Sequence, residues 1–412
     1  MTVRVTSRAL VKRIRNMKIL HICLCSFFPD NYSYQENLLP KYHKINGHHV
    51  EVIASLQTFD KFGKVSYLPK SETYFNEYNI KVTRLDYKKP DFIYKKLKSY
   101  KFVYENIEKF NPEIIFVHGG QFLDIRVVRK YVKKNPNVKL YIDNHADFSN
   151  SARSWISKNI LHKILWRFLL KSIEPYTIKF YGVMPVRVSF LIDIYKLPKD
   201  KCDLLVMGAD DEVLKKIDTF SNRQIIRKTY NINSNDFLVV FGGKIDEFKK
   251  QVLILMDAIN MIDSIDIVLL IFGSISKQLK NEFDSRLSKR IKYIGWINSI
   301  ESYKIFDSSD LVCFPGRHSV FWEQVVGQGI PMLVKYWPGM EHLDLNGNLK
   351  YLYEDSSEEI VKKIIQISEK TEYKKMKKIA ESEGKKLFSY SHISCKSIEH
   401  TAKEMRKIND EK

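Results

Sequence analysis

Two lysines follow a pair of glycines at the end of an apolar stretch, a pattern suited to binding a diphosphate. The expected strand Phe237–Phe241 runs into Gly242 and Gly243, Lys244 follows at once, and Lys249 lies near the start of the next expected helix. Backbone without a Cβ can approach a ligand closely, and ammonium groups beside a helix start attract phosphate. A solvated turn with ordinary surface lysines would show the same pattern.

A second polar loop joins an apolar stretch to an expected helix at residues 314–331 (FPGRHSVFWEQVVGQGIP). It offers an imidazole at His318, a hydroxyl at Ser319, a carboxylate at Glu323 and an amide at Gln324. These groups can hydrogen-bond sugar and phosphate oxygens, and the helix start offers free backbone N–H groups. His318 is equally typical of a surface residue that caps a helix.

Together the two segments resemble the C-terminal domain of glycosyltransferases of the GT-B fold, family 4. That family has an Arg followed by a Lys five residues later, and Lys244 and Lys249 stand at these positions. Ser319 matches a family glycine whose backbone N–H meets a phosphate. The family's Glu-x7-Glu pair falls on Gly316 and Gln324, with Glu323 one residue out of register. The resemblance implies that the donor is bound by Gly243, Ser319, Val320, Glu323 and Gln324, with Glu323 or Gln324 on the ribose hydroxyls. His318, which the family pattern lacks, is expected to join them.

The resemblance extends through the first half of the chain. Residues 46–52 (NGHHVEV) match a Gly-His-x-Val pattern, and His145 ends an apolar stretch where members carry a histidine that contacts the donor sugar. The usual paired glycines after the first strand are missing, and residues 29–36 (PDNYSYQE) offer hydroxyls and amides instead. A histidine at a strand end is also typical of a satisfied core group. The resemblance implies catalytic roles for His145, Lys244 and Lys249. On the acceptor side, where the chain departs from the family, we expect His118, Asn31 and Tyr32.

Several signatures of other chemistries are absent from the sequence. It has no P-loop, no G-x-G-x-x-G fingerprint, no D-x-D triplet and no Cys/His cluster with metal-ligand spacing. We therefore expect no metal and no cofactor, the nucleotide-sugar being a substrate. The family resemblance implies a metal-independent transfer that retains the anomeric configuration.

The positive charge is concentrated in one half of the chain. Of a net charge of +20, residues 1–200 carry +18 and residues 201–412 carry +2. Such a bias indicates an anionic partner: a membrane face, a nucleic acid or an acidic substrate. The basic residues are scattered and no nucleic-acid-binding motif appears, so we expect no nucleic acid.

One segment of this basic half has the pattern of an amphipathic α-helix. Between Trp155 and Lys171, apolar residues recur with a period near 3.6, and lysine, arginine and histidine fill the other side. A helix packed on its own domain's core would also fit. The charge favours docking on an anionic membrane surface, where each basic residue contributes about 1 kcal/mol.

Short apolar strands alternate with helical segments along the whole chain, a pattern typical of βαβ units in parallel sheets. We predict an α/β protein with two Rossmann-like doubly wound domains that face each other across a cleft. The expected divisions are a basic extension at 1–16, an acceptor-side domain at 17–207, a nucleotide-sugar-binding domain at 208–390, and a C-terminal helix at 391–412 that packs back on the first domain. Trp296, in a turn resembling the family's nucleobase-lining stretches, is expected to pack in the core.

The combined interpretation is a glycosyltransferase that acts on a glycan or a lipid-linked acceptor in bacterial surface polysaccharide biosynthesis. We expect it in the cytoplasm, peripherally bound to the inner face of the plasma membrane. The five cysteines form no C-x-x-C pair, which suits a reducing compartment. A nucleotide-sugar epimerase of the same fold is the main alternative, and a basic nucleic-acid-binding protein is a lesser one.

Overall fold

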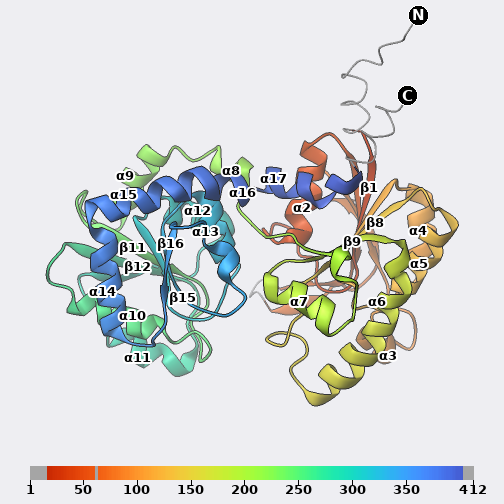
Figure 1. Cartoon of the computed structure of the whole chain (residues 1–412), viewed down its shortest axis with the longest axis horizontal. Helices are drawn as coiled ribbons and strands as arrows, with labels where there is room; N and C mark the ends of the chain where they lie inside the picture. Colours follow the sequence, from red (N-terminus) through yellow and green to blue (C-terminus); the bar gives the residue numbers. More distant parts are fainter. Residues whose placement is uncertain (1–15, 61–63, 402–412) are drawn as a thin grey trace, which may run out of the picture. The chain divides into compact units, whose positions relative to one another are not determined.

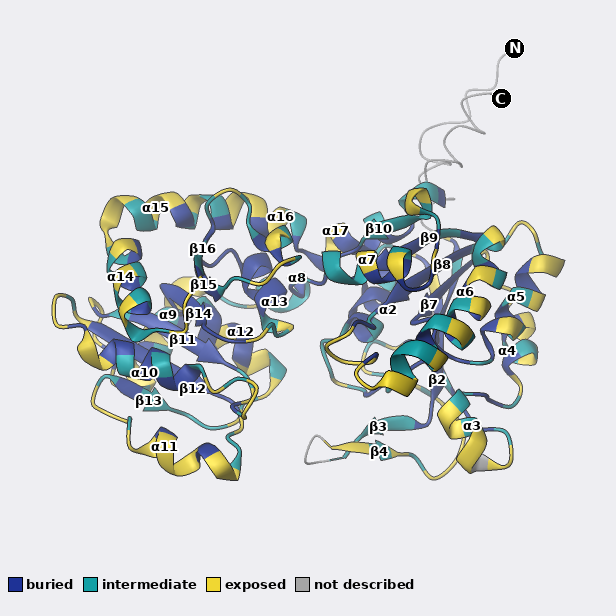
Figure 2. Cartoon of the chain, turned by 60° about the horizontal axis from the view of Figure 1, so that its bottom comes forward, coloured by how far each residue is buried: buried dark blue, intermediate teal, exposed yellow. Residues whose placement is uncertain are grey.

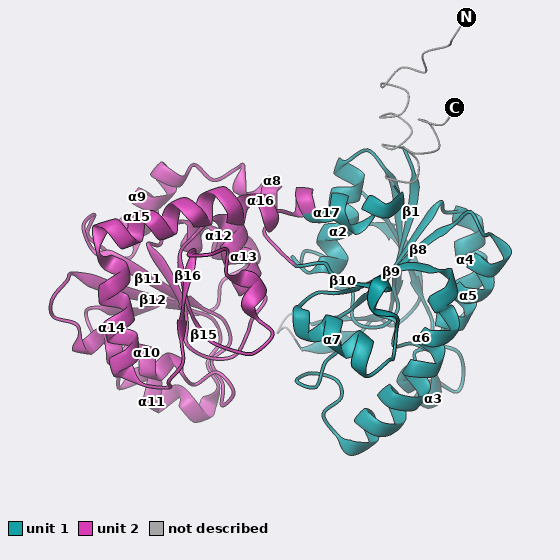
Figure 3. Cartoon of the chain, viewed as in Figure 1, with its two compact units in different colours: residues 1–206, 393–412 teal, residues 207–392 magenta. Residues whose placement is uncertain are grey.

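The structure is a computed structural model that describes residues 16–60 and 64–401 (Figure 1). Buried strands are surrounded by helices with exposed outer faces (Figure 2). The chain divides into two compact units, one of residues 1–206 with 393–412 and one of residues 207–392 (Figure 3). Residues 1–15 of the expected basic extension and residues 402–412 of the expected C-terminal segment lie outside the described residues.

Unit 1 is built on a sheet that has eight strands within the described residues, in the order β10-β9-β8-β7-β1-β2-β6-β5. Every neighbouring pair is parallel except β5 with β6. The strands are β1 (Lys18–Cys23), β2 (His49–Ser55), β5 (Glu72–Phe75), β6 (Lys81–Leu85), β7 (Ile114–His118), β8 (Lys139–Asn144), β9 (Thr177–Gly182) and β10 (Cys202–Leu204).

The two faces of this sheet differ in chemistry because successive side chains of a strand point to opposite faces. Aliphatic residues such as Leu20, Val117 and Ile142 face a core formed with α4 (Val103–Phe110), α5 (Ile125–Lys134), α6 (Arg167–Ile173) and α7 (Pro185–Asp193). The intervening positions carry rings and ionisable groups. They are His21, Phe116, His118, Tyr141, Asp143 and Tyr181.

The ring-bearing face is covered by α2 (Gln35–Ile45) and by the C-terminal part of α17 (Tyr390–Ser397). The His43 ring of α2 contacts Ser397 of α17, and the Tyr141 hydroxyl hydrogen-bonds Thr401. Residues 393–401 therefore fold with unit 1, although the chain reaches them only after completing unit 2.

Unit 2 contains a sheet that, within the described residues, has six strands, all parallel, in the order β13-β12-β11-β14-β15-β16. Together with the sheet of unit 1 it confirms the predicted α/β class with parallel sheets. The strands are β11 (Phe237–Gly242), β12 (Ile267–Phe272), β13 (Ile291–Tyr293), β14 (Leu311–Phe314), β15 (Met332–Lys335) and β16 (Leu349–Leu352). The main helices are α9 (Thr219–Thr229), α10 (Val252–Met261), α12 (Ser299–Asp307), α13 (Phe321–Gln328), α14 (Ser357–Ser368) and α15 (Lys370–Ile379).

Each sheet has a point at which the strand order reverses. In unit 1 the reversal falls between β1 and β7, and in unit 2 between β11 and β14. Ligands in open parallel sheets bind beyond the carboxyl ends of the strands at such points. His118, which ends β7, and Gly243, which follows β11, lie at these two places.

The segment Trp155–Lys171 differs from the single α-helix that the sequence predicted. Residues Ser157–Trp166 form a π-helix, and α6 continues from Arg167. The apolar residues of the segment divide between a buried and an exposed face. Trp166, Leu169 and Leu170 are buried, whereas an exposed ridge consists of Trp155, Ile156, Ile160, Ile164 and Phe168.

Two further features of the structure differ from what the sequence analysis anticipated. The prediction that Trp296 packs in the core is wrong, because its side chain is 73% exposed in the turn after β13. The short antiparallel pair β3 (Gln57–Phe59) and β4 (Val65–Tyr67) has no counterpart in the sequence analysis. In the part of the chain that the structure describes, none of the helices has the length and apolar character needed to cross a bilayer.

Candidate functional site

A buried carboxylate lies between two histidines at the carboxyl ends of β7 and β8. The Asp143 Oδ2 atom accepts a hydrogen bond from His118 Nδ1 at 2.9 Å, and its Oδ1 atom lies 3.3 Å from His145 Nε2. Oδ1 also accepts from the backbone N–H of Gly119 at 2.8 Å. Asp143 and His118 are buried, whereas the His145 side chain is 29% exposed and is the accessible end of this cluster.

The charges of this cluster stabilise one another. Burial alone would lower the pKa of His145, but the carboxylates of Asp143 and Glu36 outweigh it and hold the pKa above its usual value. Burial alone would raise the pKa of Asp143, but His145 and His118 hold it well below its usual value. Asp143 is therefore an anion at neutral pH, and His145 is biased towards the cation.

His118, Asp143 and His145 each place a ligand atom within 4.8 Å of the others, a spacing that a metal ion could use. Both Asp143 oxygens, however, already accept hydrogen bonds from within the protein. The His145 Nε2 atom has no hydrogen-bond partner and meets Asp143 only as an ion pair at 3.3 Å. Because the carboxylate is already engaged, we assign no cation to the cluster.

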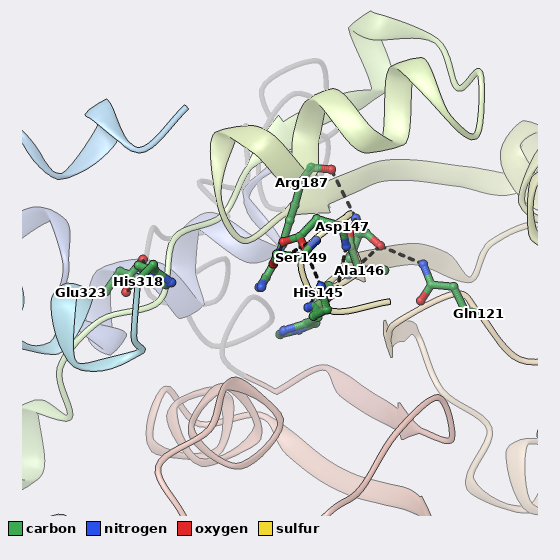
Figure 4. Close-up of polar contacts among 10 residues, drawn as sticks. Gln121, His145, Ala146, Asp147, Ser149, Arg187, His318 and Glu323 are labelled. Atoms are coloured by element: carbon green, nitrogen blue, oxygen red, sulfur yellow. Dashed lines mark hydrogen bonds and ion pairs between the residues drawn. The ribbon is translucent and has the colours of Figure 1, made fainter. Parts of the chain in front are cut away.

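The loop that carries His145 is fixed by its own polar contacts (Figure 4). The Asn150 side-chain amide donates to the carbonyl oxygen of His145 at 2.7 Å. Two residues after His145, Asp147 accepts from Ser149 and from Arg187, the latter at 2.9 Å. On the strand side, Gln121 donates to Asn144 at 2.8 Å. These bonds hold the imidazole in a defined place at the strand end.

The predicted acceptor residues Asn31 and Tyr32 lie in the loop after β1. Asn31 is exposed, has a left-handed backbone with φ of 62°, and donates its N–H to Glu77 at 2.8 Å. The Tyr32 ring stacks on Tyr34 and contacts Phe59, with ring centroids 5.5 and 5.3 Å apart. Partly exposed aromatic rings of this kind offer apolar faces to a ligand.

In unit 2, glycines join the carboxyl ends of β11, β12 and β13. The N–H of Gly243 donates to Phe272 O, and that of Gly273 donates to Gly295 O at 2.8 Å. A Cβ on Gly273 would lie 1.8 Å from the Gly243 carbonyl oxygen, so only glycine fits there. Gly243 itself has φ of 139° and open space where a Cβ would stand.

The two lysines of this loop differ in environment. Lys244 is 68% exposed, and its Nζ pairs with Asp246 at 3.1 Å. Lys249 is half-buried; burial, only partly offset by Asp246, holds its pKa below the usual value. Lys249 is thus the less hydrated ammonium group, which makes it the stronger partner for an anion.

The polar loop before α13 encloses a second buried carboxylate. Glu323 is fully buried, and both of its oxygens lie 2.9 Å from His318 Nε2. The His342 Nε2 atom is 3.4 Å from Glu323 Oε1. Burial alone would raise the pKa of Glu323, but the two imidazoles lower it to about 2. Glu323 therefore orients His318 rather than presenting free oxygens (Figure 4).

Three more residues selected from the sequence lie in or before the first turn of α13, namely Gln324, Ser319 and Val320. Gln324 points inward, and its amide donates to Gln328 at 3.0 Å. Val320 caps the start of α13 and is 45% exposed. Ser319 precedes it and accepts through its backbone carbonyl from the N–H of Trp322. The N–H group of Phe321 donates to the Ser319 hydroxyl at 3.4 Å, so the first two N–H groups of α13 are already engaged with Ser319. An anion at this helix start would therefore meet the N–H groups of Ser319 and Val320.

The structure thus groups the sequence-selected residues into two sets, one in each unit. Sequence reasoning missed Asp143, which pairs with both selected histidines, and His342, which pairs with Glu323. It also missed His21 and His43, which continue the cluster behind His118. Asp143 lies two residues from His145, and that spacing on a strand was the one local signal available.

Comparison with solved structures identifies the architecture as the GT-B fold and confirms the predicted resemblance at the level of fold. A glycosyltransferase from Rickettsia africae superposes with a TM-score of 0.67 and 18% identity, covering 95% of this chain and 99% of that one. Sucrose-phosphate synthase from Thermosynechococcus elongatus gives 0.66 and 13%, covering 96% and 100%. UDP-GlcNAc 2-epimerase from Neisseria meningitidis, solved with UDP-GlcNAc, gives 0.61 and 14%, covering 94% and 100%. No protein-family model and no curated protein sequence matches the chain.

Proposed function

We propose that this protein is a glycosyltransferase that moves a sugar from a nucleotide-sugar donor to a glycan or lipid-linked acceptor. The observation that carries the proposal is the strand-end arrangement of unit 2, where Gly243, Lys244 and Lys249 lie at the reversal point of a parallel sheet. The GT-B fold, shared with the Rickettsia glycosyltransferase, supports it.

In the proposed donor site, the diphosphate binds Lys244, Lys249 and the backbone N–H groups at Ser319 and Val320. As the bond between the anomeric carbon and the phosphate oxygen breaks, negative charge grows on the leaving diphosphate. Two ammonium groups and a helix start stabilise that charge without reorganising. The acceptor hydroxyl bonds to the anomeric carbon, and its proton passes to the leaving phosphate oxygen. Retention follows when both events take place on the same face of the sugar.

The remaining contacts are assigned from position. Trp296, exposed one residue after Gly295, is proposed to stack on the nucleobase. His145, held by Asp143, is proposed to donate a hydrogen bond to the donor sugar. The rings of Tyr32 and Tyr34 are proposed to line the acceptor side.

The first test is a thermal-shift screen with UDP-, GDP-, ADP- and CMP-sugars on the wild type and on Lys244→Ala/Lys249→Ala. We expect a stabilising shift with one nucleotide that the double variant loses. Lys250→Ala is the matched control, because Lys250 is exposed beside Lys249 and is assigned no contact. Absence of a shift with every donor, or an equal shift in the double variant, would contradict the proposal.

An epimerase is the second candidate, favoured by the similarity to the Neisseria UDP-GlcNAc 2-epimerase. The two activities differ in what they need, because an epimerase converts its nucleotide-sugar without an acceptor. Incubating the donor found by the screen with the protein alone, and following the sugar by NMR, separates them. Appearance of an epimer with the nucleotide still attached would replace the transferase proposal.

The acceptor is proposed to lie at an anionic membrane surface, which would place the protein at the inner face of the plasma membrane. The exposed ridge of Trp155, Ile156, Ile160, Ile164 and Phe168 supports this. Residues 148–173 contain five basic and no acidic residues, and Lys163, Arg167 and Lys171 line a surface hollow of ≈ 530 Å³ together with Ile164 and Phe168. Apolar rings flanked by cations suit the boundary of an anionic leaflet.

Vesicle flotation tests this surface. We expect binding to phosphatidylglycerol-containing vesicles at low salt, weaker binding to neutral phosphatidylcholine, and loss in Ile164→Ser/Phe168→Ser. Phe220→Ser, at a similarly exposed phenylalanine of unit 2, is the matched control. Equal binding by the double variant and the wild type would refute this docking surface, and so would wild-type protein that ignores anionic vesicles.

A further inference from the structure

Three buried imidazoles form an unbroken hydrogen-bonded row from the C-terminal helix to Asp143. The His43 Nδ1 atom lies 3.0 Å from His21 Nε2, and His21 Nδ1 lies 2.9 Å from His118 Nε2. His118 Nδ1 donates to Asp143 Oδ2 at 2.9 Å. The row therefore uses both nitrogens of each ring, and the three side chains are at most 3% exposed.

The far end of the row has two partners of different kinds on α17. The His43 Nε2 atom lies 2.9 Å from the hydroxyl oxygen of Ser397 and 3.2 Å from the carbonyl oxygen of Ser394. A hydroxyl can donate to an unprotonated nitrogen, whereas a carbonyl oxygen can only accept from an N–H. Either protonation state of Nε2 on His43 is thus provided with a partner.

Because the row ends at the Asp143 carboxylate, which can only accept hydrogen bonds, two arrangements of its protons satisfy every hydrogen bond. Since Asp143 is an anion, His118 Nδ1 must carry a hydrogen in both. In the neutral arrangement, His21 and His43 carry theirs on Nδ1. The Ser397 hydroxyl, which otherwise donates to the Ser394 carbonyl oxygen at 2.7 Å, then turns its hydrogen towards His43 Nε2. In the charged arrangement, His21 and His43 carry theirs on Nε2, His43 donates to the Ser394 carbonyl, and His118 is protonated on both nitrogens.

We propose that His43, His21 and His118 form a buried proton relay that takes up one proton beside Asp143 and thereby sets the charge balance around His145. A proton added at Nε2 of His43 is matched by transfer of its Nδ1 proton to Nε2 of His21. The Nδ1 proton of His21 then passes to Nε2 of His118. No ring turns, the row gains one positive charge, and that charge is located next to the Asp143 carboxylate.

The consequence for His145 follows from Coulomb's law. With the row neutral, the full negative charge of Asp143 acts on His145, 3.3 Å away, and favours its protonated form. With the row charged, His118 offsets that carboxylate, so His145 releases its proton more readily. The row residues are positioning residues, because they act through Asp143. The role of His145 in transfer rests on the proposed function, but the relay itself does not.

Other ionisable groups around the row are few. His48, in the turn after α2, has its ring centroid 5.9 Å from that of His43. Burial, together with the neighbouring imidazoles, holds the pKa of His21 well below its usual value and that of His43 at about 3. Because both pKa values are lowered, the row has its neutral arrangement at neutral pH. The groups that face the row and Asp143 are His48, His145, Glu36 and Cys23, with Tyr141 behind Phe116.

Nitrogen-15 NMR of histidine-labelled, ligand-free protein tests the relay, because imidazole nitrogen shifts distinguish the two tautomers. On lowering the pH, we expect His21 and His43 to change from Nδ1–H to Nε2–H together, in a single step. If His21 and His43 keep one tautomer throughout the pH range in which the fold persists, the relay is refuted. The measurement needs no substrate, so failure of the transferase proposal would not affect it.

Two variants should shift the pH midpoint of this tautomer change in opposite directions. Ser397→Ala removes the donor that supports the neutral arrangement, so the midpoint should rise by roughly half to one pH unit. His43→Phe leaves His21 Nε2 without an acceptor for a proton, so the midpoint should fall. Ser394→Ala is the control, because it retains the carbonyl and should leave the midpoint in place. Equal shifts in all three variants would show general loosening and would overturn the assignment.

Discussion

The buried histidines of unit 1 should make this unit sensitive to mild acid, and His43 allows the effect to be calculated. Burial holds the pKa of His43 at about 3, against about 6.5 in an unfolded chain. A folded-state pKa below the unfolded value means that the unfolded state binds more protons as the pH falls through 6.5. Stability is therefore complete above pH 6.5 and is lost progressively towards pH 3.

The magnitude follows from linkage. Between pH 7 and pH 5, one histidine with these two pKa values lowers the free energy of unfolding by about 2 kcal/mol. His48, whose pKa burial lowers to about 4, adds a similar loss, and His21 acts in the same direction. His145, with its raised pKa, opposes them in part, because its charged form is favoured in the folded state.

The assay is a urea titration at pH 7 and pH 5, read by hydrogen exchange of peptides from β1 and β7 so that unit 1 is followed separately. In His43→Phe, the loss of stability between the two pH values should be smaller than in the wild type by about 2 kcal/mol, whatever the variant's stability at pH 7. His49→Gln, at an exposed position, is the matched control. Identical pH dependence in the wild type and His43→Phe would refute the reasoning.

Three further predictions concern unit 2. Glu323→Gln should lower the free energy of unfolding by about 3 kcal/mol at pH 7, because the folded protein depresses the pKa of Glu323 from 4.5 to about 2. The stability that the wild type gains from this carboxylate is present above pH 4.5 and disappears as the pH falls towards 2. Urea unfolding at several pH values checks this dependence. Trp296→Ala should weaken nucleotide binding in calorimetry about threefold to tenfold while leaving the melting temperature unchanged, because the ring is exposed; unaltered affinity would exclude stacking. Asp310→Ala should cost about 3–5 kcal/mol, because it leaves the buried guanidinium of Arg227, now 2.8 Å from the carboxylate, unpaired; a loss below 1 kcal/mol in urea unfolding would contradict this.

Strands such as β7 and β11 were predictable because each is a short apolar run that ends in a histidine or a glycine. The predicted strand Phe237–Phe241 agrees with β11 to within one residue. The GT-B resemblance also followed from local features, namely the loop with Lys244 and Lys249. Strand composition and turn chemistry are properties of neighbouring residues, so one sequence reveals them.

In several places the sequence did not reveal which side chains are buried or which groups they contact. Trp296 has the composition of a core residue and yet is exposed, because its turn lies after the last residue of the edge strand β13. The apolar residues of Trp155–Lys171 suggested one face, whereas in the structure they divide between a buried and an exposed face. Glu323 was selected as a contact for ribose, and its two histidines turn it into a buried ion pair.

The alternation of strands and helices, the basic first half and the positions of glycine and lysine at strand ends can all be recognised from the order of the residues alone. Only the tertiary structure decided that His21 meets His118, 97 residues away, and that His43 meets Ser394, 351 residues away. The physical reason is that burial and hydrogen bonding depend on which elements the sheet order brings together. Adjacent strands β1, β7 and β8 place His21, His118 and Asp143 on one face, and α17 returns to cover it.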